Sequence, residues 1–461
     1  MERRQEAGIP TLREGDELTL AIGDLAFGGR GVGRTAGRVV FVHGALQGET
    51  VRARITAVRR QHAEARTLSV LHPSPDRRTP PCAHYGRCGG CSLQHLEPGA
   101  QARAKETQVR ALIARVGKLP GAAVRPIIGT PEPWRYSSRM DFDWSQDSGG
   151  RPVIGLHRAG RGDEVVAVQD CHLLSDNGNQ ILQWMVGQAV RRRLSVWDGR
   201  RRRGLLRRLS LQEARGTGEI LVTLETGRGD PPLLASLGSD LQRFAPRVVG
   251  VVRREFSRDG TAAGVSLIAG RDYLVEQIEE DRFRIPCGAF FQPHGAGSAL
   301  LRRTVLEALA PRPGWRVLEL FAGVGFLTVA LGRQGVSVTA VEGRREAAAA
   351  ARHNLRAAGV ERCDVVCGEV TEVLPEILRQ GPFDGLLLDP PRGGLRPAAV
   401  RALSGGAARR VVYVSCDPAT LARDLGRLTT EGGFGLESVI PLDLFPQTGH
   451  VECVAILAGI A

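Results

Sequence analysis

Lysine is almost absent from this 461-residue chain, and aromatic residues are scarce. Lys105 and Lys118 are the only lysines, and Phe, Trp and Tyr together make up 5% of the sequence. The net charge is nevertheless +13, so arginine carries nearly all of the positive charge. Because phosphate contacts release condensed counterions, this excess of basic residues favours a nucleic acid partner. The alternative is a basic surface that is merely solvated.

Long apolar segments are also missing. The sequence has no run of about 18 uncharged apolar residues, which excludes the usual membrane-spanning helix. The first twenty residues contain no apolar stretch after their basic start, so we expect no secretion signal and a cytoplasmic protein. In that compartment nine cysteines argue against a disulfide framework and for metal or catalytic roles.

The length allows about three domains at roughly 150 residues each. Residues 1–73 contain the short alternating segments LTLAI, RVVFV and VRARITAV between glycine-rich turns, which predicts a small OB-like β-barrel. A proline-rich linker follows. Residues 74–272 mix strand-like segments with a helix near 177–193, so we predict a mixed α/β domain. Near its start, apolar residues at helical spacing predict an amphipathic helix over residues 98–119.

Residues 273–461 change rhythm from Pro311 onward. Apolar strands, glycine turns and helices alternate there, from WRVLELFAGVGF to the final VECVAIL. Repeated βα units of this kind predict a Rossmann-like, doubly wound α/β sheet. The ligands of such sheets bind beyond the carboxyl ends of the strands.

One glycine turn follows the first strand of this domain and opens a helix. Gly323 and Gly325 allow a ligand to approach the backbone closely, and Glu342 ends the next strand, where a carboxylate can accept ribose hydroxyls. A lone G-x-G is weak evidence and also fits a plain tight turn. The pattern E-x-F-x-G-x-G favours S-adenosylmethionine over a nicotinamide cofactor.

Three further candidates stand at strand ends of the same domain. Asp389 begins the turn Asp-Pro-Pro-Arg, and Cys416 follows the next apolar strand and precedes an Asp-Pro turn. Glu452 starts the last apolar strand, where an unpartnered carboxylate would cost stability. The simpler interpretations are a strand cap, an inert packed thiol and a surface ion pair. We favour Cys416 as a nucleophile.

A second group of cysteines lies in the first half of the chain. Cys82, Cys88 and Cys91 are closely spaced, and Cys171 stands far downstream. Four thiolates can hold zinc or an iron–sulfur cluster, and short spacings by themselves favour zinc. A separate run places nine arginines around Trp197, between residues 191 and 208. It fits either phosphate binding or a solvated helix face.

The motifs around residues 319–326, 389–392, 416–421 and 450–453, in this order, resemble the RNA uracil-5-methyltransferase family, specifically its 23S ribosomal RNA branch, over essentially the whole chain. The resemblance implies a class I methyltransferase fold with Cys416 as nucleophile and Glu452 as general base. It also implies a set of cofactor residues around S-adenosylmethionine, with Glu369 on the adenine side: Gln292, Phe321, Gly323, Gly325, Glu342, Glu369 and Asp389. His294 and Phe326 depart from the family, which often has Asn and a polar residue there.

The same resemblance extends to the rest of the chain. It implies that the N-terminal barrel is an RNA-binding TRAM domain and that Cys82, Cys88, Cys91 and Cys171 hold a [4Fe-4S] cluster. It also implies a flipped or unpaired uridine in 23S ribosomal RNA, with Phe290 able to stack on a neighbouring base. We expect a monomer without an obligatory protein partner. Uridine 54 of transfer RNA is the alternative substrate, and a non-catalytic RNA-binding or assembly factor is the alternative class.

Overall fold

The computed structural model describes residues 12–459 apart from 36, 230, 293 and 405–407. The first eleven residues of the predicted barrel domain therefore lie outside the described residues. The chain forms two compact units: Met1–Gln108 with Pro446–His450, and Val109–Phe445 with Val451–Ala461. The predicted division into three domains, with boundaries at 73/74 and 272/273, stays a prediction. Among the described residues, no helix has the length and apolar character needed to cross a bilayer.

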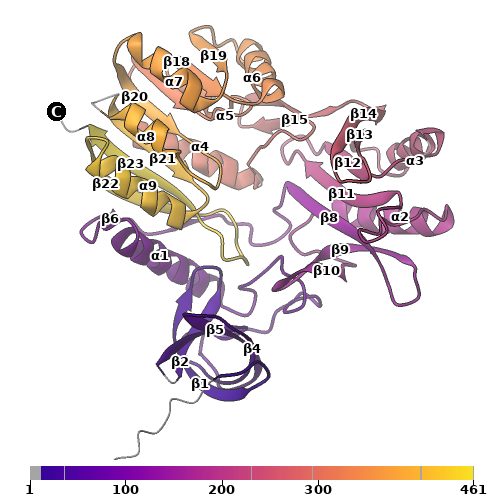
Figure 1. Ribbon diagram of the computed structural model, residues 1–461. Coiled ribbons are helices and arrows are strands. Elements are labelled where there is room, and N and C mark those ends of the chain that lie inside the picture. The colour runs from indigo at the N-terminus through magenta and orange to yellow at the C-terminus, as the bar shows by residue number, and fades with distance from the viewer. Residues whose placement is uncertain (1–11, 36, 230, 293, 405–407, 460–461) are drawn as a thin grey trace, which may run out of the picture. The chain divides into compact units, whose positions relative to one another are not determined.

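The first unit contains the predicted barrel (Figure 1). Its five strands close in the order β1-β2-β3-β5-β4, and only the β3–β5 pairing is parallel. Alternate residues such as Leu20, Ile22, Val40 and Val42 point inward and are fully buried. The alternating sequence thus yields the barrel that it predicts. The strands are β1 (Glu17–Ala26), β2 (Arg30–Thr35), β3 (Arg38–His43), β4 (Thr50–Val58) and β5 (His62–His72).

Helix α1 (Pro98–Arg115) is the predicted helix of residues 98–119, but it ends four residues earlier. A side chain at Gly117 would lie 2.6 Å from the carbonyl oxygen of Ile113, and Lys118 adopts a left-handed φ of 57°. Both features stop the helical ladder. Val109 and Ile113 are buried as the periodicity requires, whereas Val116 is 45% exposed because it lies beyond the last turn.

A short segment near the carboxyl terminus, residues 446–450, belongs to the first unit. The carbonyl oxygen of Gln447 accepts hydrogen bonds from the backbone amides of Ser92 (3.1 Å) and Leu93 (2.9 Å). The Gln447 backbone amide donates to Gln101 Oε1 (3.0 Å), and Gln101 Nε2 donates to Gln447 Oε1 (3.1 Å). Nothing in the sequence predicts this arrangement, because its partners lie 346 residues apart.

The second unit contains a seven-stranded sheet, ordered β10-β9-β8-β11-β12-β13-β14 (Figure 1). Its pairings are antiparallel except for β12–β13, which α3 connects. Helix α2 packs on β9, and α3 packs on β13 and β14. This is the predicted mixed α/β region. Its elements are β8 (Arg139–Gln146), β9 (Pro152–Arg158), β10 (Arg161–Ala167), α2 (Asp176–Arg191), β11 (Leu206–Glu213), β12 (Ile220–Thr226), α3 (Pro231–Phe244), β13 (Val248–Phe256) and β14 (Ala262–Gly270).

A hairpin and a long helix then lead into the predicted Rossmann-like sheet, which has nine strands. Its order is β19-β18-β17-β20-β21-β23-β22-β6, with β7 also on β22. The hairpin is β15 (Tyr273–Ile278) with β16 (Asp281–Pro286), and the helix is α4 (Gly295–Leu309). The strands are β17 (Arg316–Leu320), β18 (Ser337–Glu342), β19 (Cys363–Cys367), β20 (Phe383–Leu388), β21 (Ala408–Ser415), β22 (Phe434–Asp443), β23 (Glu452–Gly459), β6 (Ala123–Val124) and β7 (Ile128–Gly129).

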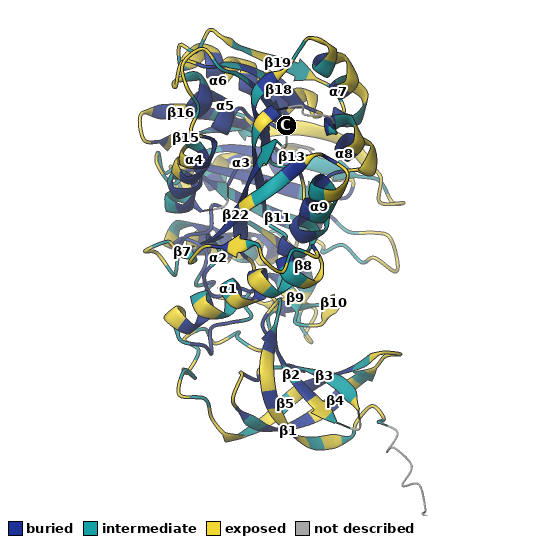
Figure 2. Ribbon diagram, turned by 90° about the vertical axis from the view of Figure 1, so that its left-hand side faces the viewer, coloured by how far each residue is buried: buried dark blue, intermediate teal, exposed yellow. Residues whose placement is uncertain are grey.

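Strands β19, β18, β17, β20 and β21 run parallel, and β23 is inserted antiparallel to β21 and β22. Helices connect the parallel strands and cover the sheet (Figure 1). In Figure 2, α1 and α9 each show a buried and an exposed side. The remaining helices are α5 (Phe326–Gly332), α6 (Arg345–Ala357), α7 (Val370–Arg379), α8 (Pro397–Leu403) and α9 (Pro418–Thr430).

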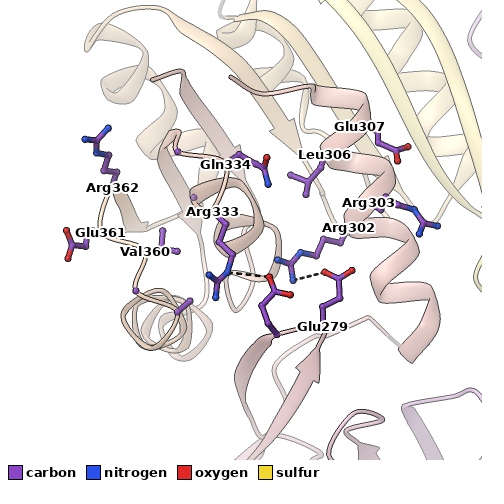
Figure 3. A pocket seen from close by; sticks show the side chains of 15 residues that line it. Glu279, Arg302, Arg303, Leu306, Glu307, Arg333, Gln334, Val360, Glu361 and Arg362 are labelled. Carbon is purple, nitrogen blue, oxygen red and sulfur yellow. Dashed lines mark ion pairs between the residues drawn. The ribbon is translucent and has the colours of Figure 1, made fainter. Parts of the chain in front are cut away.

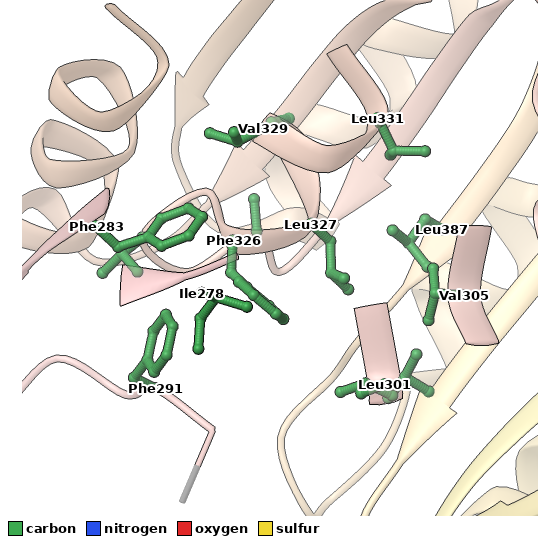
Figure 4. Packing of buried hydrophobic residues seen from close by; sticks show 14 of the residues in the cluster. Ile278, Phe283, Phe291, Leu301, Val305, Phe326, Leu327, Val329, Leu331 and Leu387 are labelled. Atoms are coloured by element: carbon green, nitrogen blue, oxygen red, sulfur yellow. The ribbon is translucent and has the colours of Figure 1, made fainter. Parts of the chain in front are cut away.

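Phe326 belongs to the core of this layer. Its ring packs edge-on against Phe283 (5.5 Å between centroids) and Phe291 (5.2 Å), as Figure 4 shows. It is 7% exposed. The aromatic residue that departs from the family pattern is therefore accommodated by two other phenylalanines, which hold the amino end of α5 against β16.

Candidate active site

One edge of the nine-stranded sheet brings the predicted site residues together. Phe321, Glu342, Asp389 and Cys416 all stand at the carboxyl ends of parallel strands. Glu452 begins β23, and because β23 runs antiparallel its start lies at the same edge. The topology alone therefore collects residues that are more than 100 positions apart in the sequence.

The glycine turn after β17 has an unusual backbone. Phe321 adopts a φ of 68°, in the left-handed region that non-glycine residues avoid. Gly323 and Gly325 follow with φ values of 58° and 83°. A Cβ atom at Gly323 would meet nothing within 4 Å, so open space borders this backbone. Strain of this kind is concentrated at functional sites.

Glu342 holds the far side of this turn. Its Oε2 accepts a hydrogen bond from the Gly323 amide (2.9 Å), and its Oε1 accepts one from the Arg344 amide (2.7 Å). Glu369, the exposed residue before α7, brings its Oε1 to 3.2 Å from the position of a Cβ atom on Gly343. Glu342 thus lies beside the glycine turn and Glu369 beside Gly343, and both carboxylates can accept hydrogen bonds from the hydroxyl and amino groups of a nucleoside.

A third carboxyl group lies below the turn. Glu319 is 2% exposed, and the buried Thr328 hydroxyl lies beside its carboxyl group. Burial raises the pKa of Glu319 to about 8; the Thr328 hydroxyl opposes this shift, and the charges of Asp389 and Glu342 add to it. Glu319 is therefore largely protonated at neutral pH. Sequence reasoning treated it only as part of the turn motif.

Cys416 and Glu452 form the second half of the site. Burial, together with the Glu452 charge, raises the pKa of the Cys416 thiol to about 11, although Arg392 opposes the shift by its charge and by a hydrogen bond. Burial also raises the pKa of Glu452 well above its usual value; Asp389 adds to this shift, and Arg392 opposes it. Burial raises the pKa of Asp389 to about 7. Glu452, Asp389 and Arg392 thus lie close enough to Cys416 to shift its pKa.

Arg392 is the functional residue that sequence reasoning missed. It ends the turn Asp-Pro-Pro-Arg after β20, and its positive charge lowers the pKa of both Cys416 and Glu452. A positive charge beside a thiol stabilises the thiolate, which is the nucleophilic form. In the sequence, Arg392 could have been found from its position three residues after Asp389, in the same turn.

The segment before α4 supplies the remaining predicted residues. Gln292 is 7% exposed, whereas the Phe290 ring is 61% exposed and Phe291 joins the core. Arg344 donates a hydrogen bond to the Gly288 carbonyl oxygen (2.9 Å), which ties this segment to the end of β18. His294 caps α4 through its Nδ1, which accepts from the Gly297 amide (3.1 Å), and it stacks on Tyr136. Its role in this chain is thus structural.

The four predicted metal-binding cysteines are divided between the two units. Cys82, Cys88 and Cys91 are half-buried in one loop of the first unit, where the Gly90 amide donates to Cys88 Sγ (3.4 Å). Cys171 is buried in the second unit, and its backbone is bonded to Asn179 (2.8 and 3.0 Å). Within the described part of the chain, no group of three or more His, Cys, Asp or Glu residues is arranged to hold a metal ion. The cluster stays a prediction.

A cavity of about 780 Å³ lies at the opposite edge of the same sheet (Figure 3). It is lined by residues that precede β18 and β19, together with the hairpin turn at Glu279 and part of α4. Arg302 and Arg333 point toward carboxylates of that turn, and Arg302 Nη1 lies 3.7 Å from Glu279 Oε2. Its arginines and glutamates neutralise each other, so this cavity offers no comparable chemistry.

Comparison with known proteins identifies two matching families. The family described as tRNA (uracil-5-)-methyltransferase matches residues 259–459, which include every predicted catalytic and cofactor residue. The TRAM domain family matches residues 12–68, which include most of the barrel.

Relatives match almost the full length of the chain. A protein named as an uncharacterised RNA methyltransferase from Gloeobacter violaceus is 34% identical over 97% of each chain. One with the same description from Halalkalibacterium halodurans is 31% identical over 98% of this chain and 99% of its own. The crystal structure of Pyrococcus abyssi tRNA (uracil-54, C5)-methyltransferase with S-adenosyl-L-homocysteine covers 96% of this chain and 100% of its own, with a TM-score of 0.75 and 22% identity. This last likeness concerns the fold.

Proposed function

The chain belongs to the RNA uracil-5-methyltransferase family, and from this premise we propose that it methylates C5 of a uridine in 23S ribosomal RNA through a covalent step on Cys416. One observation carries the proposal. Glu452, Asp389 and Arg392 shift the pKa of Cys416 at the sheet edge that also carries the glycine turn, and Asp389 and Arg392 shift that of Glu452. A nucleophile, a base and a cation thereby meet at the edge where open space borders the backbone of Gly323.

The residues around the glycine turn fit S-adenosylmethionine. The open space at Gly323 admits a ligand against the backbone, and the carboxylates of Glu342 and Glu369 suit the hydroxyl and amino groups of adenosine. Gln292, Phe321 and Asp389 complete the proposed set. The bound cofactor supplies an electrophilic methyl group.

The reaction begins at Cys416. Carbon 5 of uracil is a weak nucleophile, so the thiolate adds to C6 and pushes electron density onto C5 and the adjacent carbonyl oxygen. Arg392 stabilises the thiolate, and a neighbouring carboxylate accepts the thiol proton as the sulfur attacks. The chain holds the two reactants in line, and this positioning accounts for much of the rate enhancement.

Glu452 completes the reaction. Once C5 carries the methyl group, its remaining proton is removed by the Glu452 carboxylate. The electron pair of the C–H bond then forms the C5–C6 double bond, and the C6–S bond breaks to release Cys416. The raised pKa of Glu452 suits a base that must accept a proton from carbon.

The uridine must leave its stack to be reached from both faces. Phe290 presents an exposed ring on the segment that also carries Gln292, so it can stack on a base next to the flipped uridine. The TRAM match supports an RNA substrate for the barrel unit as well.

A transfer RNA is the second candidate substrate. The matching family is described by a transfer-RNA activity, and the full-length structural relative acts on uracil 54 of tRNA. Ribosomal RNA is preferred because of the four cysteines, which we propose to hold a [4Fe-4S] cluster, with zinc as the alternative. The hydrogen bond from the Gly90 amide to Cys88 Sγ suits a charged sulfur ligand. Iron and sulfide analysis of anaerobically purified wild type and Cys88→Ser tests this assignment.

The function is tested by methyl transfer from labelled S-adenosylmethionine. Unmodified 23S ribosomal RNA and unmodified transfer RNA are each incubated with the wild type and with Cys416→Ala. We expect label in 5-methyluridine of ribosomal RNA with the wild type only. Label in transfer RNA would identify transfer RNA as the substrate. The absence of label on either RNA, with folded and metal-replete protein, would favour a non-catalytic assembly factor.

A further inference from the structure

One end of the seven-stranded sheet carries a dense group of exposed arginines. Strand β11 starts there, β12 and β13 end there, and the chain leaving α2 pairs with the start of β11 through Ser195, whose carbonyl oxygen accepts from the amides of Leu205 (3.0 Å) and Leu206 (2.9 Å). We call this group the arginine edge. Its exposed members are Arg193, arginines 200–203, Arg228 and Arg258.

A folded hairpin presents the central part of the arginine edge. The Trp197 amide donates to the Leu206 carbonyl oxygen (2.8 Å), and the Asp198 amide donates to that of Arg203 (2.8 Å). At the base of the hairpin, the Arg207 guanidinium lies between the rings of Trp197 (4.5 Å) and Phe256 (4.7 Å). Arginines 200–203 are therefore held on an ordered turn, which reduces the entropy lost when they bind a ligand.

The carboxylates at this end are fewer, and they are engaged by their own turns. Asp198 Oδ1 accepts from the amides of Arg200 (2.9 Å) and Arg201 (3.0 Å), and Asp259 Oδ1 accepts from the Thr261 amide (3.0 Å). The Arg201 side chain approaches Asp198 only at 3.7 Å. The arginine edge thus keeps a net positive charge.

The arginine edge is remote from the active site. The other end of β11 leads to the catalytic domain, where the Arg215 and Gly216 amides donate to the Glu276 carboxylate of β15 (2.8 and 2.7 Å). The eight residues of β11 separate the two ends by about 25 Å. A ligand that reached both places would have to be a long polyanion.

We propose that the arginine edge is a second RNA-docking surface, which binds phosphates of the substrate RNA at a distance from the methylated uridine. The proposal rests on RNA being the substrate, and it deepens the proposed function by requiring an extended RNA. Arginine contacts phosphates in pairs of parallel hydrogen bonds, and phosphate contacts are independent of base sequence. The surface therefore favours large folded RNAs over short fragments.

The test compares RNA affinity in two matched variants. The first variant replaces Arg200, Arg201 and Arg202 with Gln. The control variant replaces Arg303, Arg356 and Arg362 with Gln, because these arginines are also exposed but lie in the catalytic domain. Binding to unmodified 23S ribosomal RNA and to ten-residue oligouridine is measured as a function of salt. For the first variant on long RNA, three lost contacts should weaken binding about 30-fold near 0.1 M salt and reduce the salt slope by about 2.

Three further results complete the test. The control variant should bind 23S ribosomal RNA like the wild type, and all proteins should bind ten-residue oligouridine with the same affinity. Replacing Arg200, Arg201 and Arg202 with Lys instead of Gln should retain most of the affinity for the long RNA. An unchanged slope for the Gln variant would overturn the proposal and leave the arginine edge for an acidic protein or for solvent. Because binding is measured without methylation, failure of the proposed activity is scored separately by label transfer.

Discussion

At the scale of single residues, burial makes the carboxyl groups of the site harder to ionise than usual. Glu319, Asp389 and Glu452 all have raised pKa values, and they surround a thiol whose pKa is raised as well. Arg392 is the cation that opposes these shifts. The free enzyme therefore holds Cys416 mainly as a thiol, and the nucleophile forms when substrate and Arg392 stabilise the thiolate.

Replacing Arg392 tests this balance. In Arg392→Ala the pKa of Cys416 should rise further, and each unit of that rise lowers the thiolate fraction about tenfold. We expect kcat/KM at pH 7 to fall by about that factor or more, with partial recovery toward pH 9 as the thiol ionises. Arg392→Lys should restore part of the rate at pH 7. The exposed Arg396→Ala is the control, and a pH profile identical to that of the wild type for Arg392→Ala would contradict the assignment.

Glu319 affects stability as well as the cofactor site. Its folded-state pKa of about 8 exceeds the usual 4.5, so the folded protein binds the proton more tightly than the unfolded chain does. The cost of Glu319 is therefore absent below pH 4.5 and grows as pH rises to 8. Relative to the wild type, Glu319→Gln should gain unfolding free energy across this window, at about 1.4 kcal/mol per pH unit or less. Denaturant unfolding at pH 5, 6.5 and 8 measures it, and a constant difference would refute it.

At the scale of elements, the helices and strands that could be predicted were those with a clear period of apolar residues or with characteristic turn residues. The barrel strands, the βα alternation from β17 to β21 and the glycine turn follow from apolar spacing and turn residues. The meeting of Cys416 with Glu452 also follows, given that strand ends share an edge. Strands β22 and β6 and the antiparallel insertion of β23 were not predicted, because pairing order depends on distant contacts and not on local pattern.

The same limit applies to individual residues. The proximity of Arg392 to Cys416 depends on the pairing of β20 with β21, which the sequence does not predict. The burial of Phe326 depends on its contacts with the rings of Phe283 and Phe291. Helix α1 ended early because Gly117 and Lys118 leave the helical conformation, although the apolar spacing continues to Val116. The period of the apolar residues identifies the buried face of a helix, whereas the residue at which the helix ends is set by backbone geometry.

The glycine turn offers a test at this scale. Gly325 precedes α5 with a φ of 83°, and a Cβ atom there would lie 3.2 Å from Ala351 of α6. Gly325→Ala should destabilise the protein by about 1–2 kcal/mol and raise the KM for S-adenosylmethionine. Gly187 of α2 has open space around it, and Gly187→Ala should raise stability by about 0.5–1 kcal/mol. Equal melting temperatures for the two variants would show that the turn tolerates a side chain.

At the scale of the whole molecule, the chain crosses between its two units close to the proposed base. Residues 446–450 belong to the barrel unit, and Glu452 follows them after a single intervening residue. Gln101 of α1 fixes this segment through its two hydrogen bonds with Gln447. The order of residues 446–450 therefore bears on how the chain enters β23 at Glu452.

Gln101→Ala tests that dependence. Losing the Gln447 contacts should lower kcat several-fold, because the segment before Glu452 becomes less ordered, while the KM for S-adenosylmethionine changes little. The control is Gln108→Ala, which removes hydrogen bonds of the same kind from α1 to the barrel carbonyl oxygens of Leu25 and Ala26. Both variants should lose about 1–3 kcal/mol of stability. If Gln108→Ala lowered kcat equally, the effect would be general loosening.

The covalent step is tested most directly by trapping the enzyme on its RNA. In Glu452→Gln the thiol can still add to uracil and the methyl group can still be transferred, but the C5 proton stays and Cys416 cannot be released. Incubation with S-adenosylmethionine and unmodified 23S ribosomal RNA should give a protein–RNA adduct that survives denaturing electrophoresis and carries the methyl label. Adding Cys416→Ala to this variant should abolish the adduct. An adduct that persists without Cys416, or full turnover by Glu452→Gln, would contradict the account.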